Sequence, residues 1–244
     1  MKIDIWSDVI CPFCLLGKRR LDAALAGWEH AGDVEVVWHS FELDPNAPRD
    51  LGGTLVEKIA NKYGVSVEQS RASQQDIARQ FTEVGAIFDW ERAKPGNTFD
   101  AHRVFHLAVE RGLGNEVMSR FMTAYFAEGA AIGEVKTVQR LAVEAGLDAD
   151  EVRSVLDGDA YGDAVRSDEL AARQMGVSGV PFFVFDHRLA VSGAQPVEVF
   201  VAALNQAWDT QVSVPTPFTS AGSTGEDDAK VCGPDGCAID DPRR

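Results

Sequence analysis

The sequence predicts an α/β fold in which a small strand-containing domain is divided by a long helical segment. Strand-like patterns occur only near the two ends of the folded part, at residues 2–6, 33–43 and 180–193. Between them, from Thr54 to about Met175, apolar residues recur at helical spacing and strand signals are nearly absent. We therefore expect half of one sheet on each side of a large helical insertion.

The composition limits the classes of function. Of the 244 residues, 45% are hydrophobic and 25% are charged, which is typical of a globular protein, and no apolar run approaches the roughly 20 residues that span a bilayer. A formal net charge of -15 argues against nucleic acid and acidic membrane surfaces as partners. Asp4 and Asp8 interrupt any secretory apolar core. We expect a cytoplasmic protein, in which paired cysteines are more often redox-active or metal-bound than structural.

The first part of the divided domain has the order strand, helix, strand. Residues 2–6 alternate like a strand, and a helix begins near Cys11 and runs through "LLGKRRLDAALAGW". The segment 33–43 is a second strand, which ends at Asp44-Pro45. Two strands joined by one helix predict a parallel pair with a crossover connection.

The rest of the chain divides into an insertion, the second part of the domain and a tail. The helical segment is broken at Gly64, Gly85, Pro95-Gly96, Gly112, Gly129 and Gly146. Asp186 to Arg188 would turn a hairpin within 180–193, and Pro196 suits the first turn of a closing helix. We assign residues 1–50 and 176–208 to the discontinuous domain, 51–175 to the insertion and 209–244 to a flexible linker and C-terminal tail.

The motif "CPFC" carries the chemistry. Cys11 falls at the expected N-terminus of the first helix, where free N–H groups and the helix dipole favour a thiolate. Cys14 is one turn further on and within reach of a disulfide. Cys11 would be the exposed nucleophile and Cys14 would resolve the mixed disulfide. Pro12 suits the first helical position, and Phe13 adds an apolar surface without charge.

Two other interpretations of this pair remain open, a zinc half-site and an inert cross-link. Zinc sites usually take two such pairs from loops or ribbons. Because a strand precedes Cys11 and a helix follows it, redox chemistry is favoured and we expect no metal.

Together three motifs carry a resemblance to a known family: "SDVICPFCLLGKRRL" at the start, "NTFDAHRV" at 97–104 and "MGVSGVPFFVFD" at 175–186. Over residues 1–208 the chain resembles the thioredoxin superfamily, and within it the DsbA-like thiol-disulfide oxidoreductases of the FrnE type. The resemblance implies a thioredoxin-like fold with an inserted helical domain. It also implies that Pro181 is a cis-proline beside the cysteines and that Val180 pairs with an extended substrate segment.

A related branch contains the 2-hydroxychromene-2-carboxylate isomerases and the kappa-class glutathione transferases. These are similar in fold, but they have serine where Cys11 stands and lack the second cysteine. The intact motif argues against that branch, and glutathione is retained as a candidate thiol partner.

The tail holds a second pair, Cys232 and Cys237, in the turn-forming sequence "CGPDGC". We hypothesise that this pair exchanges disulfides with Cys11 through the linker, which would give a high effective concentration. An idle dithiol, a static disulfide and a zinc clasp are the alternatives, although no histidine lies in the tail to complete a zinc site.

Two further features have a structural and a functional interpretation. His102, His106 and Glu110 are spaced by helical turns, as metal ligands can be, but we favour packing or hydrogen bonding because the pattern lacks a glutamate beside the first histidine. The cluster "FMTAYF" (121–126) predicts helical core, with an apolar wall for peptide substrates as the alternative.

These observations favour a thiol-disulfide oxidoreductase that acts on proteins or small thiols and needs no cofactor. A glutathione-dependent transferase or isomerase is the first alternative. A redox or metal sensor is the second, since related folds serve several functions.

Overall fold

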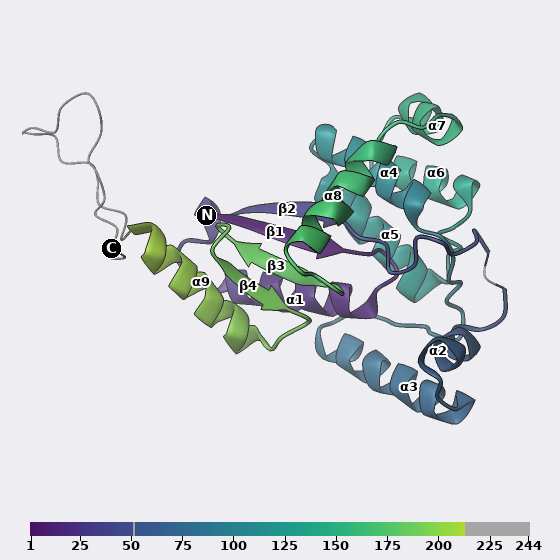
Figure 1. The fold of residues 1–244 in the computed structure, drawn as a ribbon, viewed down its shortest axis with the longest axis horizontal. Helices are drawn as coiled ribbons and strands as arrows, with labels where there is room; N and C mark the ends of the chain where they lie inside the picture. The colour runs from purple at the N-terminus through teal and green to yellow at the C-terminus, as the bar shows by residue number, and fades with distance from the viewer. Residues whose placement is uncertain (51, 213–244) are drawn as a thin grey trace, which may run out of the picture.

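The computed structural model describes residues 1–50 and 52–212. In chain order the elements are β1 (Lys2–Ser7), α1 (Pro12–Ala26), the 3-10 turn η1 (Ala31–Asp33), β2 (Glu35–Ser40), α2 (Leu55–Tyr63), α3 (Val67–Glu83), α4 (Phe99–Glu110), α5 (Gly114–Glu128), α6 (Val135–Glu144), α7 (Ala149–Asp157), α8 (Gly162–Gln174), β3 (Phe182–Phe185), β4 (Leu189–Ser192) and α9 (Val197–Val212). Two strands precede the helices α2 to α8 and two follow them, which confirms the predicted division of the sheet (Figure 1).

The four strands form one mixed sheet in the order β2-β1-β3-β4. β1 runs parallel to β2, as predicted, with Ser7 opposite Ser40. It runs antiparallel to β3, with Trp6 opposite Phe182. The C-terminal ends of β1 and β2 therefore lie beside the N-terminal end of β3. The residues around Cys11, which follow β1, and Pro181, which precedes β3, come together at this end of the sheet.

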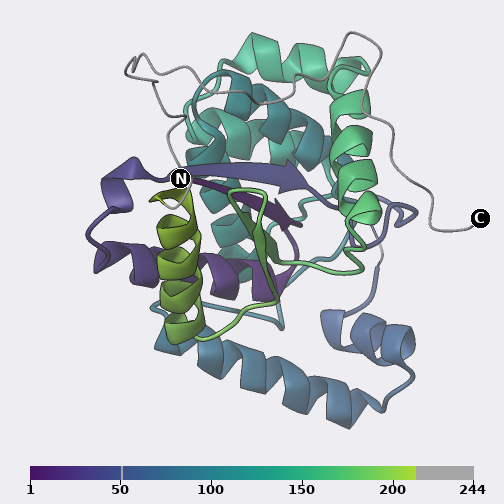
Figure 2. The ribbon, with the colours of Figure 1, turned by 60° about the vertical axis from the view of Figure 1, so that its left-hand side comes forward.

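Helices cover both faces of the sheet (Figure 1). α1 and α9 pack against each other on one face, and the ring of Phe183 in β3 meets that of Phe200 in α9 at 4.9 Å between centroids. α8 packs on β2 and on α4, within a bundle that α5, α6 and α7 complete. Figure 2 shows this bundle on one side of the sheet and α2 with α3 on the other, below α1.

Local signals explain where the insertion helices begin and end. α2 and α3 each start with a capping box, Thr54 with Glu57 and Ser66 with Gln69, which satisfies N–H groups that a helix start leaves free. α2 ends at Gly64 in the left-handed conformation, with a φ of 66°, which glycine adopts at little cost. The predicted breaks within the insertion are confirmed at the glycines that end α2 and α5.

Element boundaries differ from the sequence-based expectation at three places. α1 ends at Ala26, and the strand expected at 33–43 is limited to β2 because η1 precedes it and the chain leaves the sheet after Ser40. α9 continues beyond Trp208, the expected end, because the Trp208 ring stacks on the His30 ring, with 4.1 Å between centroids, and anchors this end of the helix.

Cys232 and Cys237 lie outside the described residues. Among the described helices, none has the length and apolar character needed to cross a membrane.

Candidate functional site

The CPFC motif lies at the turn from β1 into α1. Cys11 is the N-cap of α1 with extended backbone (φ −83°, ψ 113°), and Pro12 occupies the first helical turn, as predicted. The N–H of Cys11 donates to the carbonyl oxygen of Asp8 at 3.1 Å, and the N–H of Cys14 donates to that of Cys11 at 3.0 Å. These bonds fix the turn and place both thiols at the same end of the helix.

Both cysteines are buried, which corrects the expectation of an exposed Cys11. Cys11 is 3% exposed and Cys14 is 1% exposed, whereas Phe13 between them is 44% exposed. The reason is the loop before β3, which crosses over the motif so that the carbonyl oxygen of Val180 accepts a hydrogen bond from the Cys11 thiol at 3.5 Å. The thiol that the sequence predicts as the nucleophile is therefore covered by this loop and lines the adjoining cavity.

The environment of Cys14 disfavours its thiolate. Burial raises the pKa of Cys14 well above its usual range, and the hydrogen bond and charge of Cys11 raise it further. The Ser7 hydroxyl and the Asp8 backbone N–H act in the opposite direction. The two thiols thus lie within hydrogen-bonding reach of each other, and Cys14 holds its proton more firmly than a solvated thiol would.

The segment between α8 and β3 forms the other wall of the site. The Val180–Pro181 peptide bond is cis. The N–H of Gly193 donates to the Pro181 carbonyl at 2.9 Å, which ties this segment to the end of β4. In the described part of the chain no hydrogen bond uses the N–H groups of Ser178, Gly179 and Val180. Unpaired backbone next to a thiol can pair with an extended chain.

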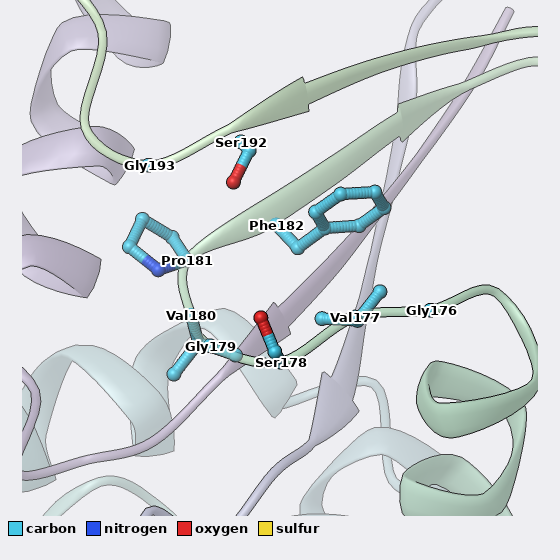
Figure 3. Close-up of a pocket in the computed structure, with 9 residues that line it drawn as sticks. All are labelled: Gly176, Val177, Ser178, Gly179, Val180, Pro181, Phe182, Ser192 and Gly193. Atoms are coloured by element: carbon cyan, nitrogen blue, oxygen red, sulfur yellow. The ribbon is translucent and has the colours of Figure 1, made fainter.

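Figure 3 shows this loop, where Gly176–Phe182, Ser192 and Gly193 line a hollow of about 300 Å³. The side chains of Ser178 and Ser192 lie toward the space between the loop and the end of β4. Residues Ser178–Val180 line both this hollow and the larger cavity beside Cys11. This part of the loop is therefore accessible to a ligand from either space.

Gly17 is a site residue that the sequence analysis missed. A methyl group at this position would lie 2.9 Å from Cζ of Phe183 and 3.1 Å from Cγ of Pro181. The missing side chain lets α1 approach the start of β3 closely enough for the loop to cross Cys11. A glycine inside a predicted helix was the available signal, because it costs stability unless close packing requires it.

A cavity of about 880 Å³ opens beside Cys11, between the CPFC turn and the helices α2 and α3. Apolar side chains dominate its wall: Phe13, Phe41, Leu43, Leu55, Ile59, Ile77, Phe88 and Tyr125. Lys58 and Lys62 of α2 also line it, and neither ammonium is within ion-pair distance of a carboxylate in the described chain. The cavity can accept an apolar group next to the thiol and a negative charge at its rim.

The aromatic cluster at 121–126 is helical core, as predicted. Phe121, Met122 and Phe126 are buried in α5. Tyr125 is also fully buried but lines the large cavity, so one member of the cluster belongs to the site as well. Burial and the charges of Asp8 and Cys11 raise the pKa of the Tyr125 phenol well above its usual range, which keeps it protonated.

The three polar residues on α4 do not converge on one point. His102 approaches Asp8 at 3.5 Å, His106 approaches Asp168 at 3.2 Å, and Glu110 accepts a hydrogen bond from Tyr161 at 2.5 Å. This supports the packing and hydrogen-bonding interpretation. Within residues 1–50 and 52–212 no group of three or more His, Cys, Asp or Glu side chains could hold a metal ion.

The remaining residues of "NTFDAHRV" build the start of α4. The Asn97 side chain accepts from the N–H of Phe99 at 2.9 Å. Buried Arg103 donates to the carbonyl oxygens of Val155, Ala160 and Gly158, which holds the chain between α7 and α8. The motif is therefore chiefly architectural, although Thr98 lines the large cavity beside Cys11 and His102 contacts Asp8.

A mixed sheet with a cysteine pair at the start of α1 and a cis-proline opposite defines a thioredoxin-like fold. The family of DSBA-like thioredoxin domains matches residues 2–205, and the chain belongs to this family.

Similarity to individual proteins extends along most of the chain. The uncharacterized protein YwbO of Bacillus subtilis is 30% identical over 205 residues, which is 83% of this chain and 95% of that protein. A crystal structure of a probable DsbA oxidoreductase from Streptomyces coelicolor has 44% identity and a TM-score of 0.84, covering 98% of this chain and 99% of that one. The cytosolic disulfide reductase DsbM from Pseudomonas aeruginosa, solved with GSH, shares the fold at 17% identity and a TM-score of 0.59, covering 86% and 100%.

Proposed function

We propose that this protein is a cytoplasmic thiol-disulfide oxidoreductase of the DsbA-like, FrnE type, in which Cys11 attacks and Cys14 resolves. One observation carries the proposal: the Cys11 thiol lies 3.5 Å from the carbonyl of Val180, with Cys14 hydrogen-bonded behind it. A substrate chain that pairs with the free N–H of Val180 would bring its own sulfur to Cys11.

The reaction has two steps. The Cys11 thiolate attacks a substrate disulfide, which forms a mixed disulfide and releases one substrate thiolate. The Cys14 thiol then loses its proton and attacks Cys11, which releases the second substrate thiol and leaves the Cys11–Cys14 disulfide. Val180 and Pro181 position the substrate, and Pro12 and Phe13 shape the surface that it meets.

A test uses the wild type, Cys11→Ser and Cys14→Ser in graded glutathione buffers, with free thiols alkylated and mapped by mass spectrometry. We expect one reversible two-electron transition at Cys11 and Cys14 in the wild type. Cys14→Ser should accumulate a mixed disulfide at Cys11, and Cys11→Ser should form none. A wild type without a reversible transition would contradict the proposal.

The partners that we propose are proteins carrying thiols or disulfides, and glutathione. The apolar cavity beside Cys11 suits an unfolded segment, and Lys58 and Lys62 suit the carboxylates of a small acidic thiol. The structure of DsbM, which shares this fold, was solved with GSH, and this supports glutathione as a partner here.

The first alternative is a glutathione-dependent transferase or an isomerase like the 2-hydroxychromene-2-carboxylate isomerases. This alternative requires only one sulfur or hydroxyl at the site, so its activity would survive Cys14→Ser. The hydrogen bond between the two thiols favours the two-cysteine mechanism.

We further propose that Cys232 and Cys237 pass electrons to or from Cys11 and Cys14. The double variant Cys232→Ser/Cys237→Ser tests this in the same glutathione series. An altered midpoint or rate of equilibration at Cys11 and Cys14 is expected. An unaltered transition would leave a one-site enzyme.

A further inference from the structure

Three polar side chains in the wall of the large cavity have no hydrogen-bond partner in the described chain. Gln74 of α3 is 4% exposed, Thr98 at the start of α4 is 2% exposed and Tyr125 of α5 is 1% exposed, and all three line the cavity. None of these side chains makes a hydrogen bond with another described residue. Buried polar groups in native proteins are nearly always paired, so these three need a partner from outside the described chain.

The polar atoms of these side chains open into the cavity and are not sealed in the core. The side-chain atoms of the described chain that are both sealed from solvent and unpaired belong to Asp4, Ser7, Glu42, His102 and Asp186. The Gln74 amide and the hydroxyls of Thr98 and Tyr125 are not among them, so a molecule in the cavity can reach them.

Other polar groups in the cavity wall are already paired within the chain. The Asp8 carboxylate accepts from the N–H of Leu43 at 2.8 Å, and Glu42 pairs with Arg166 at 2.5 Å. The Ser70 hydroxyl donates to a carbonyl oxygen of α2 at 2.8 Å. The buried groups that remain for a ligand are therefore neutral donors and acceptors.

Aromatic packing holds α3 and α5 in a fixed relation. Phe81 lies two turns after Gln74 on the same face of α3, and its ring meets that of Phe126 in α5 at 5.1 Å between centroids. Phe126 directly follows Tyr125, and these two rings are 4.9 Å apart. Gln74 and Tyr125 are thus positioned before any ligand enters, which reduces the cost of binding.

The neutral character of the two side chains matches a peptide amide. Because burial raises the pKa of the Tyr125 phenol, the hydroxyl stays protonated and can donate to a carbonyl oxygen. The Gln74 amide can accept from an N–H as well as donate. A charged group would give up more hydration here than an amide does, and the lysines that line the cavity, Lys58 and Lys62, belong to α2.

The cavity also adjoins the backbone that pairs with substrate in the proposed function. Ser178, Gly179 and Val180 line it, and their N–H groups make no hydrogen bond in the described chain. An extended chain advances about 3.3 Å per residue, so a substrate paired with Val180 places its neighbouring residues in the cavity.

We propose that Gln74 and Tyr125 are specificity-determining residues that hydrogen-bond to backbone amides of a peptide substrate held in the cavity beside Cys11. The inference rests on the proposed function and narrows its substrates to disulfides whose cysteine belongs to a peptide. Tyr125 donates to a substrate carbonyl oxygen, and Gln74 accepts from a substrate N–H. An apolar side chain of the same segment packs against Leu55, Ile59 and Ile77, which line the cavity.

The test compares short peptide disulfides with depsipeptides in which one backbone amide beside the cysteine is replaced by an ester. An ester has no N–H, and its carbonyl oxygen is a weaker acceptor. We measure kcat/KM for each compound with the wild type, Gln74→Leu and Tyr125→Phe. In the wild type at least one ester should lower kcat/KM about fivefold, as the loss of one hydrogen bond does. In each variant, a preference that the wild type shows should fall to within about twofold of unity.

Gln75→Leu and Tyr161→Phe are the matched controls, because neither residue lines the cavity. Gln75 is exposed on α3, and the Tyr161 hydroxyl donates to Glu110 at 2.5 Å. Both variants should keep the wild-type preference for the amide. The ratio of amide to ester is the readout, since a merely structural defect slows both compounds alike and leaves their ratio unchanged.

The outcomes separate this inference from the proposed function. A wild type that reacts equally with amides and esters overturns the inference, and this arm needs no variant to fold. A preference that survives in both variants also overturns it, because the amide would then pair elsewhere. A wild type that reacts with neither the peptides nor 2-hydroxyethyl disulfide, which has no amide, contradicts the oxidoreductase itself.

Discussion

The thiol of Cys11 donates to the carbonyl oxygen of Val180 across 169 positions of sequence. The contact exists because β1 and β3 are antiparallel neighbours, so the chain leaving β1 meets the chain entering β3. It depends on the distance between α1 and β3 as well, since the motif sits on the first turn of α1. Residues that set this distance should therefore influence both stability and exchange.

Gly17→Ala should destabilise the protein. The added methyl group would meet Phe183 at 2.9 Å and Pro181 at 3.1 Å, and overpacking of this kind costs about 1–3 kcal/mol. The better helix propensity of alanine returns about 1 kcal/mol of that. The difference is a net loss of about 0–2 kcal/mol in the free energy of unfolding, centred on about 1 kcal/mol, which urea denaturation measures.

Gly27→Ala is the matched control, because a methyl group at Gly27, at the end of the same helix, would have no neighbour within 4 Å. Its free energy of unfolding should stay within about 0.5 kcal/mol of the wild type. Equal effects of the two substitutions would show that the approach of α1 to Pro181 is not under steric restriction.

Phe13→Ala should weaken the binding of apolar peptide substrates without weakening the fold. Phe13 is 44% exposed at the mouth of the large cavity, so a bound peptide would bury area that folding leaves uncovered. We expect KM for a peptide disulfide with a large apolar neighbour to rise about fivefold, which corresponds to about 1 kcal/mol of apolar burial. The reaction with a small polar disulfide should not change.

Ile87→Ala is the control for this prediction, since Ile87 is 68% exposed and does not line the cavity. If it raised KM as much as Phe13→Ala does, a general loss of surface hydrophobicity would explain the effect. The cavity mouth would then have no special role.

The lysines of α2 should select for negative charge in small substrates. Lys58 and Lys62 face the cavity without ion-pair partners in the described chain, although the sequence carries a net charge of -15. Exposed charge pairs contribute up to about 1 kcal/mol, so each substitution to Ala should raise KM for glutathione disulfide about two- to fivefold.

Cystamine, a disulfide without carboxylates, separates charge from shape in this experiment. Its KM should be unchanged or lower in both lysine variants, and added salt should reduce the difference between the two substrates. Lys136→Ala, on the distant helix α6, should affect neither substrate. A similar rise for both disulfides would contradict a charge-based preference.

The sequence predicted those parts of the site that depend on local signals. The strand–helix turn with Pro12 after Cys11 follows from patterning and helix-start preferences, and the hairpin of β3 and β4 follows from turn residues. It did not predict the burial of Cys11 or the role of Gly17. The burial of Cys11 and the packing of Gly17 both depend on the distance between α1 and β3, which lie more than 160 positions apart in the sequence. A local sequence pattern cannot predict such a distance.

A polar cluster at the β2 edge also escaped prediction because its members are far apart in sequence. His39 in β2 lies 2.8 Å from Asp4 of β1 and 2.9 Å from Asp168 of α8, and its ring stacks on Trp6. Burial lowers the pKa of His39, but the hydrogen bonds to Asp168 and Asp4 outweigh it and raise the pKa above 6.5. The cluster joins α8 of the insertion to the central sheet.

The two carboxylates titrate in the opposite sense. Burial raises the pKa of Asp4, but Lys2 and His39 outweigh it and lower the pKa below 3.8. The pKa of Asp168 is likewise lowered, against burial, by His106, His39 and the N–H of Ser40. Their contributions to stability are present above pH 3.8 and are lost as the pH falls through the folded values.

We therefore expect the free energy of unfolding from this cluster to be greatest between about pH 4 and 6.5 and to fall at higher pH. The contribution of His39 is fully present below its unfolded pKa and is lost as the pH rises through its higher folded value.

His39→Gln should cost about 1–3 kcal/mol in the free energy of unfolding at pH 6, because it leaves two buried carboxylates less well paired. It should also flatten the decline of that free energy from pH 6.5 to 9. Urea denaturation across this range measures both effects. His187→Gln, at a 74% exposed side chain 3.8 Å from the same Asp4, should keep the wild-type slope. An equally steep decline in His39→Gln would assign the pH dependence to other groups.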